Sequence, residues 1–191
     1  GDWRVERIRE LSSLAVGVVG VGRIGRAVAR RLTGFGAACY GVDPQLGDDE
    51  LLAAGLQPGA DAIPAEVDIV SLHAPGVACI VDREWLRRAR PGLILVNTAR
   101  GSLVDEDAVA DAIRSGQLGA YAADAFTIEG GPGAGPLLAP DIADRVVLTP
   151  HWAAQTVEAV DRMGSMAVDA VTAVLDGRVP THTVSEEQGH A

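Results

Sequence analysis

The chain has 191 residues, of which 48% are hydrophobic and only 4% aromatic, so it suits one domain whose core consists of small aliphatic side chains. Its formal net charge of −10 argues against binding to nucleic acids or anionic membranes. All 16 basic residues are arginines, which excludes Schiff-base or Walker-type lysine chemistry. Cys39 and Cys79 are too few for a disulfide framework or a metal site. No apolar run reaches the roughly 18 residues of a membrane span, so we expect a cytoplasmic protein.

Apolar runs of strand length alternate with helical patterns along the chain. This alternation predicts an α/β fold in which a doubly wound parallel sheet carries helices on both faces. The expected strands are residues 14–19, 37–42, 60–63, 68–72, 93–97, 119–124 and 146–148. The expected helices are residues 23–32, 48–54, 82–90, 105–115 and 156–175, with Asp82 capping the third and Gly116 closing the fourth. Residues 130–135 are expected to form a glycine- and proline-rich loop.

The first expected strand runs directly into a G-x-G-x-x-G pattern, which opens the following helix. In this pattern Gly20 permits a tight turn and Gly22 lets the backbone approach a pyrophosphate, while Gly25 lets the helix pack closely on the strand. The pyrophosphate would lie against the N–H groups and the positive dipole end of the helix. Placed between a strand and a helix, the motif predicts a Rossmann-type dinucleotide site.

Asp43 stands at the end of the second expected strand, 18 residues after Gly25. A carboxylate at this point can accept hydrogen bonds from both hydroxyls of an adenosine ribose, and it would repel a 2′-phosphate. No arginine follows in residues 44–47, so the sequence favours NAD over NADP. The alternative is that Asp43 only caps the end of the strand.

Five blocks of sequence, the first of which overlaps the glycine motif, occur in the order and spacing found in the D-isomer-specific 2-hydroxyacid dehydrogenases. These are Gly22-Arg23-Ile24-Gly25-Arg26, Ser71-Leu72-His73-Ala74-Pro75, Val96-Asn97-Thr98-Ala99-Arg100-Gly101, Ala123-Asp124-Ala125-Phe126 and Thr149-Pro150-His151. The chain resembles the nucleotide-binding domain of that family from Gly1 to about Pro180. The resemblance implies an NAD-dependent hydride transfer to or from a small 2-hydroxy or 2-keto acid.

The resemblance also implies roles for individual residues. Arg100 follows a buried strand and would hold the substrate's carbonyl and carboxylate oxygens with its planar fork. His151 follows another strand and is similar to the family's general acid/base, with Glu129 as the carboxylate that supports it. Asp124 would hold the nicotinamide carboxamide or its ribose. The full set of expected cofactor contacts is Gly20, Gly22, Arg23, Ile24, Gly25, Asp43, Pro75, Thr98, Ala99, Arg100, Asp124 and His151.

We expect the sequence to depart from the family pattern in three places. The substrate domain that normally comes first would be missing, the stretch from Pro75 to Pro91 is about three residues short, and residues 130–136 replace a more regular segment after Glu129, with Gly130 in place of the usual proline. We therefore expect a Rossmann domain over residues 1–177 and a polar tail over residues 178–191 that is a remnant of the substrate domain. The isolated chain should turn over poorly, because half of the cleft is missing.

The expected partners are a small 2-keto or 2-hydroxy acid, a second copy of the chain in a homodimer formed through the nucleotide-binding domain, and a missing substrate domain. Neither a metal nor nucleic acid is expected. One alternative function is an NAD-sensing, co-repressor-like dimer without significant turnover, since such relatives can retain Arg100, Glu129 and His151. Another is a natural half-protein that complements a separate substrate domain.

Overall fold

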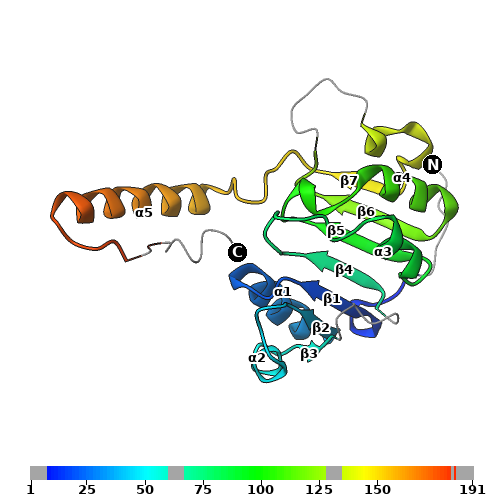
Figure 1. Cartoon of the computed structure of the whole chain (residues 1–191), viewed down its shortest axis with the longest axis horizontal. Coiled ribbons are helices and arrows are strands. Elements are labelled where there is room, and N and C mark those ends of the chain that lie inside the picture. Colours follow the sequence, from blue (N-terminus) through cyan, green and yellow to red (C-terminus); the bar gives the residue numbers. More distant parts are fainter. Residues whose placement is uncertain (1–7, 60–66, 128–134, 182, 184–191) are drawn as a thin grey trace. The chain divides into compact units, whose positions relative to one another are not determined.

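The computed structural model describes residues 8–59, 67–127, 135–181 and 183, and the chain divides into two compact units, Gly1–Leu148 and Thr149–Ala191. The described part of the first unit forms a seven-stranded parallel sheet with the order β3-β2-β1-β4-β5-β6-β7 (Figure 1). The strands are β1 (Ala15–Val19), β2 (Ala38–Val42), β3 (Gln57–Pro58), β4 (Ile69–Leu72), β5 (Leu93–Asn97), β6 (Leu118–Ala123) and β7 (Val146–Leu148). The predicted doubly wound α/β fold is confirmed.

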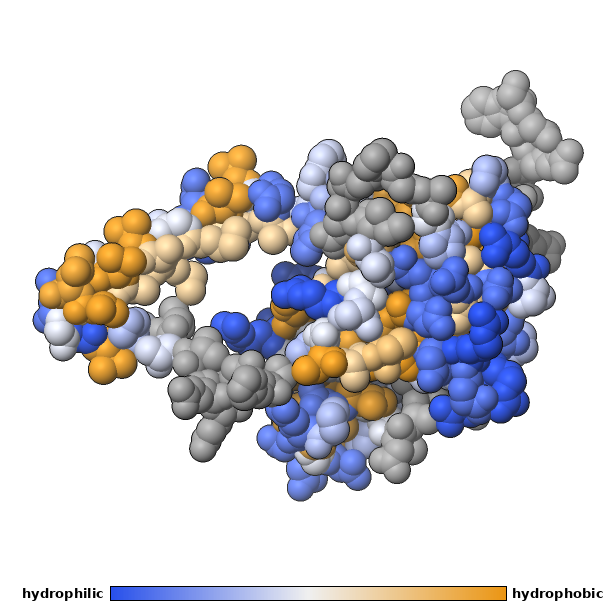
Figure 2. Space-filling view, turned by 45° about the horizontal axis from the view of Figure 1, so that its top comes forward, coloured by the Kyte–Doolittle hydropathy of each residue, from blue (hydrophilic) through white to orange (hydrophobic). Residues whose placement is uncertain are grey.

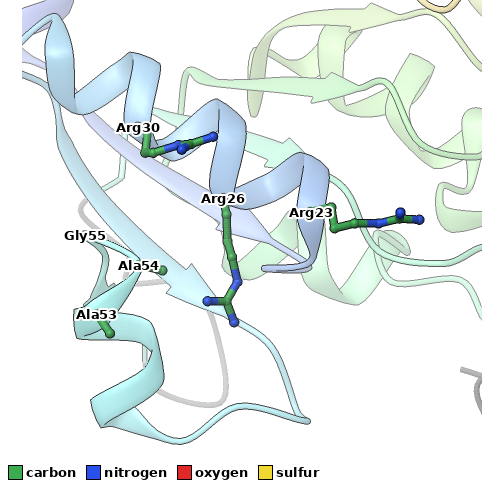
Figure 3. A pocket seen from close by; sticks show the side chains of 6 residues that line it. All are labelled: Arg23, Arg26, Arg30, Ala53, Ala54 and Gly55. Atoms are coloured by element: carbon green, nitrogen blue, oxygen red, sulfur yellow. The ribbon is translucent and has the colours of Figure 1, made fainter. Parts of the chain in front are cut away.

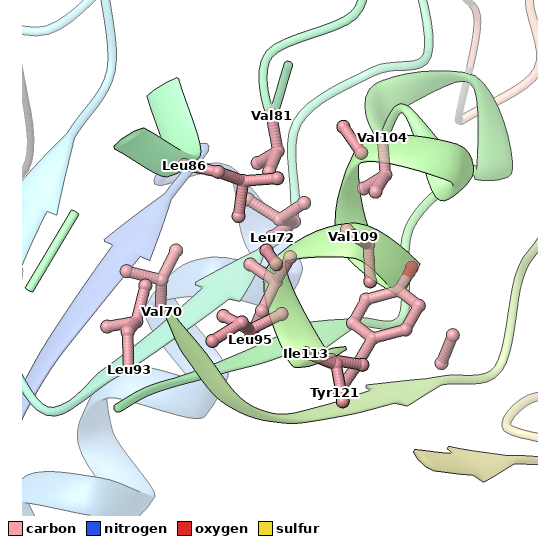
Figure 4. Close-up of a cluster of buried hydrophobic side chains, with 14 of the residues drawn as sticks. Val70, Leu72, Val81, Leu86, Leu93, Leu95, Val104, Val109, Ile113 and Tyr121 are labelled. Atoms are coloured by element: carbon pink, nitrogen blue, oxygen red, sulfur yellow. The ribbon is translucent and has the colours of Figure 1, made fainter. Parts of the chain in front are cut away.

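Helices cover both faces of this sheet. α1 (Arg23–Gly34) and α2 (Asp48–Ala53) cover one face, and α3 (Arg83–Arg88) and α4 (Glu106–Ser115) cover the other. Because side chains alternate along a strand, Val16 and Val18 pack under the first pair of helices, while neighbouring Ala15 packs on the opposite side. The larger core lies under α3 and α4 and is built mainly from leucine, valine and isoleucine, with Tyr121 as its largest side chain (Figure 4).

The predicted helix ends follow from side-chain caps and one glycine. The Asp82 carboxylate accepts a hydrogen bond from the Trp85 N–H at 2.7 Å, so the predicted cap of α3 is confirmed. Asp105 caps α4 in the same way through the Ala108 N–H at 3.0 Å, and the helix therefore begins one residue later than expected. Gly116 ends α4 with a φ of 79°, a conformation that glycine adopts without strain.

The edge of the sheet beside β2 differs from the prediction. β3 consists of only Gln57–Pro58, paired with Tyr40 and Gly41 of β2, and has no alternating apolar pattern by which sequence could reveal it. The strand expected at residues 60–63 and most of the loop expected at residues 130–135 lie outside the described residues. The other strands begin and end within one residue of their predicted bounds.

The second unit consists, in its described part, of a connecting segment and one long helix, α5 (Val157–Leu175), which Thr156 caps through the Ala159 N–H. Many valine and methionine side chains of α5 are exposed, and Figure 2 shows them as an apolar band along the helix. α5 ends at Leu175, the predicted last residue, and Gly177 two residues later has a φ of 68°. The compact units divide after Leu148, whereas the domain boundary expected after residue 177 stays a prediction. Among the described residues, no helix is both long and apolar enough to cross a membrane.

A charged cluster closes the edge of the sheet where β1 and β4 begin. The Asp68 carboxylate accepts hydrogen bonds from the Ala15 backbone N–H at 2.9 Å and from the guanidinium groups of Arg9 and Arg90, each at 2.5 Å. The Ala15 hydrogen bond, helped by Arg9 and Arg90, lowers the pKa of Asp68 below its usual value. Asp68 thereby ties the start of β1 to the start of β4 and to the end of α3.

Asp68 should make the stability of this domain depend on pH. Its pKa is lowered by folding, so its contribution is present above the unfolded value of about 3.9 and is lost as the pH falls through the lower folded value. We expect Asp68→Asn to lower the free energy of unfolding near neutral pH by about 1–3 kcal/mol and to make acid unfolding less steep below pH ~4. Urea unfolding across this range, with exposed Asp49→Asn as the control, measures both effects. Parallel acid unfolding of Asp68→Asn and the native chain would contradict this assignment.

Candidate functional site

The order of the strands reverses between β1 and β4, and side chains and loops that follow these strands meet at the carboxyl edge of the sheet. In open α/β sheets, this reversal opens the crevice in which ligands bind. Here the loops after β1 and β4 touch, because a Cβ on Gly20 would lie only 2.5 Å from the Ala74 nitrogen. Gly20 also has a φ of 85°, so both its conformation and its surroundings require glycine.

The three glycines of the G-x-G-x-x-G motif have different surroundings. A Cβ on Gly25 would lie 2.1 Å from the Gly20 carbonyl oxygen, so Gly25 is required for α1 to pack on the turn. A Cβ on Gly22 would have no atom of the described residues within 4 Å, and Gly22 stands at the N-terminal cap of α1. The turn is therefore open at Gly22 and closed at Gly20 and Gly25, as expected if a pyrophosphate approaches the backbone beside the first turn of the helix.

Arg23 and Ile24 form the exposed beginning of α1. Arg23 also lines a hollow of about 500 Å³ with Arg26, Arg30 and the residues at the end of α2 (Figure 3). Arg26 donates from Nε to the Val21 carbonyl oxygen at 2.9 Å, and none of the three guanidinium groups forms an ion pair with a described residue. The outer side of α1 is thus locally positive in a chain of net charge −10, which favours anionic ligands beside the glycine turn.

Asp43 directly follows β2 and is half-buried beside the glycine turn. Its carboxylate accepts hydrogen bonds from the Val21 N–H at 2.8 Å and from the Gln45 N–H at 3.0 Å. The structure therefore contains the strand-end cap that the sequence left open as an alternative. Each oxygen of a carboxylate can accept more than one hydrogen bond, so this cap leaves capacity for ribose hydroxyls.

The loop after β4 lies against the glycine turn at the same sheet edge. The His73 ring lies 2.9 Å from the Ser71 hydroxyl, measured from Nε2, and burial lowers the pKa of His73. The ring is therefore neutral near pH 7, and the backbone N–H of His73 donates to the Val19 carbonyl at 2.7 Å. Pro75 follows in an exposed position. His73 thus contacts the end of β1 through its backbone and Ser71 through its ring.

Arg100 stands in the loop after β5, behind Thr98 and Ala99, and its side chain is exposed. The guanidinium donates from Nη1 to the Ala99 carbonyl at 2.7 Å. A Cβ on Gly76 would lie 2.8 Å from the Cβ and Cγ atoms of Arg100, so the stem of the arginine rests on the loop after β4. The structure thus brings Arg100 beside the β4 loop, at the same sheet edge as the glycine turn.

Asp124 follows β6 and is only 7% exposed. Its backbone N–H donates to the Asn97 carbonyl at 3.0 Å, and the Asn97 side chain donates from Nδ2 to the Arg100 carbonyl at 2.9 Å. Asn97 also holds the Ala99 N–H at 3.1 Å. Sequence analysis assigned no role to Asn97, although an asparagine at the end of a buried strand signals a polar side chain that needs internal partners.

The other two residues of the expected catalytic trio are Glu129 and His151. Glu129 lies outside the described residues. His151 belongs to the second unit, where its backbone has a φ of 55° and its N–H donates to the Thr149 carbonyl at 2.9 Å. A positive φ is uncommon for a residue other than glycine and occurs often at functional sites. The pairing of Arg100, Glu129 and His151 stays a prediction.

Comparison with known proteins gives a family match over most of the chain. Residues 1–153 match the sequence model of the D-isomer specific 2-hydroxyacid dehydrogenase, NAD binding domain. D-3-phosphoglycerate dehydrogenase from Mycobacterium leprae is 39% identical over 94% of this chain, which spans 34% of that protein. Glyoxylate reductase from Thermofilum pendens is 36% identical over 93% of this chain, which spans 53% of that protein. The chain therefore spans about a third to a half of these relatives.

Solved structures show the same fold, one of them with NAD bound. D-lactate dehydrogenase from Aquifex aeolicus, complexed with NAD and lactic acid, superposes with a TM-score of 0.80 at 29% identity, over 92% of this chain and 58% of that chain. D-lactate dehydrogenase from Treponema pallidum has a TM-score of 0.83 at 30% identity, over 96% of this chain and 60% of that chain.

Substitutions at different glycines of the motif should affect NAD binding and folding separately. We expect Gly22→Ala to leave the melting temperature almost unchanged and to weaken NADH binding about 10-fold or more, because the new methyl group meets no protein atom but occupies the approach of the pyrophosphate. Gly25→Ala should instead destabilise the domain, since its methyl group would overlap the Gly20 carbonyl. Fluorescence titration with NADH and thermal unfolding measure the two effects. Unchanged NADH affinity in Gly22→Ala would contradict this placement of the cofactor.

The open Gly22 at the start of α1, the switch point between β1 and β4, and the family match over residues 1–153 all agree. They identify the cofactor as NAD, and the residues at the crevice fit it. The chain belongs to the D-isomer-specific 2-hydroxyacid dehydrogenases, of which it contains the NAD-binding domain.

Proposed function

We propose that this chain supplies the cofactor-binding half of an enzyme that transfers a hydride between NAD(H) and a small 2-hydroxy or 2-keto acid. The observation that carries the proposal is the position of Arg100, at the carboxyl end of β5 and against the Gly76 loop that follows β4. A cation at this edge lies on the side of the sheet to which Rossmann folds direct their ligands. Arg100 is also exposed, so its guanidinium is available to a substrate.

The substrate class follows from the chemistry of this guanidinium. A planar fork of N–H donors binds adjacent carbonyl and carboxylate oxygens together, which suits a 2-keto acid. It also polarises the carbonyl, so that the carbon becomes a better hydride acceptor. The names of two relatives fit this substrate class, since one is named a glyoxylate reductase and another was solved with lactic acid.

We assign the proton transfer to His151 and its support to Glu129. When the keto acid is reduced, the bound nicotinamide supplies a hydride to the carbonyl carbon. The imidazolium of His151 donates a proton to the carbonyl oxygen, and in the reverse direction the neutral imidazole removes the hydroxyl proton. A carboxylate at Glu129 would stabilise the imidazolium and orient the ring. Asp124 would hold the nicotinamide carboxamide or its ribose, with Pro75, Thr98 and Ala99 along the same edge.

The proposal extends to the assembly. Because the chain spans only part of its relatives, we propose that a substrate domain, supplied by preceding sequence or by a separate chain, completes the cleft and excludes water. We also propose a cytoplasmic homodimer formed through the nucleotide-binding domain. Light scattering of the purified protein measures its mass and tests the dimer.

The direct test of the function is turnover. The protein, expressed with any sequence that precedes this chain in its gene, is assayed with NADH and a panel of pyruvate, glyoxylate and hydroxypyruvate. Oxidation of NADH that depends on one of these acids is expected. NADH binding without turnover of any acid in the panel would be the behaviour of an NAD-sensing binding protein and would overturn the enzymatic proposal.

Arg100 and His151 should affect different steps. We expect Arg100→Ala to lower kcat/KM for the keto acid about 10- to 100-fold through loss of charge-assisted hydrogen bonds. His151→Ala should lower kcat about 100- to 10,000-fold, with little change in NADH affinity. Arg83→Ala, which removes an exposed arginine of α3, is the control for loss of positive charge. Equal losses of kcat and of NADH affinity in His151→Ala would mean that this residue supports the structure instead.

Asp43 should determine the preference for NADH over NADPH. Asp43→Ser is expected to weaken NADH binding about 10-fold and to improve NADPH binding relative to NADH, because the ribose loses its acceptor and the 2′-phosphate loses a repulsive charge. Asp43→Asn keeps an oxygen that can accept the Val21 N–H, so it separates the ribose contact from the structural cap. Titration of each variant with NADH and NADPH measures the ratio. An unchanged ratio in Asp43→Ser would remove the ribose role of this residue.

A further inference from the structure

A buried polar cluster lies behind the loop that carries Arg100. It contains Asn97, with no exposed surface, and Glu106, which is 9% exposed and is the first residue of α4. Tyr121 of β6 is also buried, and a side-chain hydrogen bond with Asn97 lowers the pKa of its phenol against the larger effect of burial. Burial, reinforced by the charge of Glu106, raises the pKa of Tyr121 to about 12, so the phenol stays neutral. Buried polar groups of this kind require defined partners.

Glu106 has a specific partner in the loop after β6. Its Oε1 atom accepts a hydrogen bond from the Thr127 backbone N–H at 2.6 Å. The position of Glu106 in the first turn of α4 favours a negative charge through the helix dipole. Burying a carboxylate is nevertheless unfavourable unless it is hydrogen-bonded, and an apolar side chain would fill the same space without this penalty. The contact with Thr127 therefore indicates that Glu106 holds the backbone at this point.

The backbone that Glu106 holds is the surface on which the Arg100 turn rests. A Cβ on Gly101 would lie 2.7 Å from the Phe126 carbonyl carbon and 2.9 Å from the Thr127 nitrogen. The two loops are thus in direct backbone contact immediately after Arg100. The Asn97 side chain bridges the two loops, because its Nδ2 atom donates to the Arg100 carbonyl at 2.9 Å and to the Ala125 carbonyl at 3.4 Å.

We propose that Glu106 is a positioning residue for Arg100. By holding the Thr127 N–H, its carboxylate keeps the Phe126–Thr127 backbone against Gly101 and so sets the direction in which the Arg100 side chain leaves the sheet. Glu106 contacts neither substrate nor cofactor and acts only through this backbone contact. The inference rests on the proposed function, because it needs Arg100 to bind the substrate.

The test is a double-mutant cycle between Glu106 and Arg100, measured in the protein with its preceding sequence. We expect Glu106→Ala to lower kcat/KM for the keto acid about 10-fold when Arg100 is present, the loss that follows from one displaced charge-assisted contact. The same substitution in the Arg100→Ala background should change kcat/KM less than about 2-fold, since residues that act as a unit are not additive. The dissociation constant of NADH should change little in either background.

Matched variants separate positioning from a general loss of stability. Glu106→Gln keeps an oxygen that can accept the Thr127 N–H, so it should restore most of kcat/KM. Asp107→Ala removes an exposed carboxylate from the same helical turn and should leave kcat/KM unchanged. Amide hydrogen exchange at Thr127 should quicken in Glu106→Ala and stay slow in Glu106→Gln. If Glu106→Ala does not fold, Glu106→Asp replaces it, because the shorter side chain withdraws the acceptor while keeping the charge.

Each result decides between the two proposals. Equal losses from Glu106→Ala in both Arg100 backgrounds would overturn the positioning role and leave the proposed function intact. Failure of Glu106→Gln to restore kcat/KM while exchange at Thr127 stays slow would overturn it as well. If Arg100→Ala alone leaves kcat/KM unchanged, Arg100 does not bind the substrate. The proposed function of that residue then fails, and the role of Glu106 fails with it.

Discussion

The rest of this domain depends on the close approach of two backbone segments where the strand order reverses. The loop after β1 lies against the loop after β4 at Gly20 and Ala74, so closely that a single added carbon would overlap backbone atoms. Gly25 sets the same limit between α1 and the turn. These contacts leave the N-terminal end of α1 facing open space at Gly22. The fold thus creates its cofactor site by bringing backbone, and not side chains, to the edge of the sheet.

The opposite side of the crevice is organised by buried polar side chains. The side chains of Asn97 and Glu106 form hydrogen bonds with the backbone of the loops after β5 and β6. These loops carry Arg100 and Asp124. Such groups are unfavourable in a core unless every partner is present, which makes the local geometry well defined. We therefore expect close packing to shape the site for the phosphate end of the cofactor, and internal hydrogen bonds to shape the site for its chemical end.

Charge is distributed unevenly over a chain that is acidic overall. Three arginines line the outer side of α1 beside the glycine turn, where they favour an anionic cofactor. At the other edge of the sheet Asp68 gathers Arg9 and Arg90 at the start of β1 and β4. The first group of arginines is available to a ligand, and the second holds strands together. The net charge of the chain does not reveal these two different roles of arginine.

The sequence by itself determined the α/β class, nearly all strands and helices, the caps Asp82 and Gly116, and the glycine turn, because each depends on local periodicity or on one residue's conformational preference. It did not reveal β3, whose two residues are a strand only through pairing with β2. It also could not show that the Asp43 carboxylate accepts the Val21 N–H, nor assign Glu106 its partner Thr127, 21 residues away. Those features arise between segments distant in the chain, and only the tertiary structure decides which of them meet.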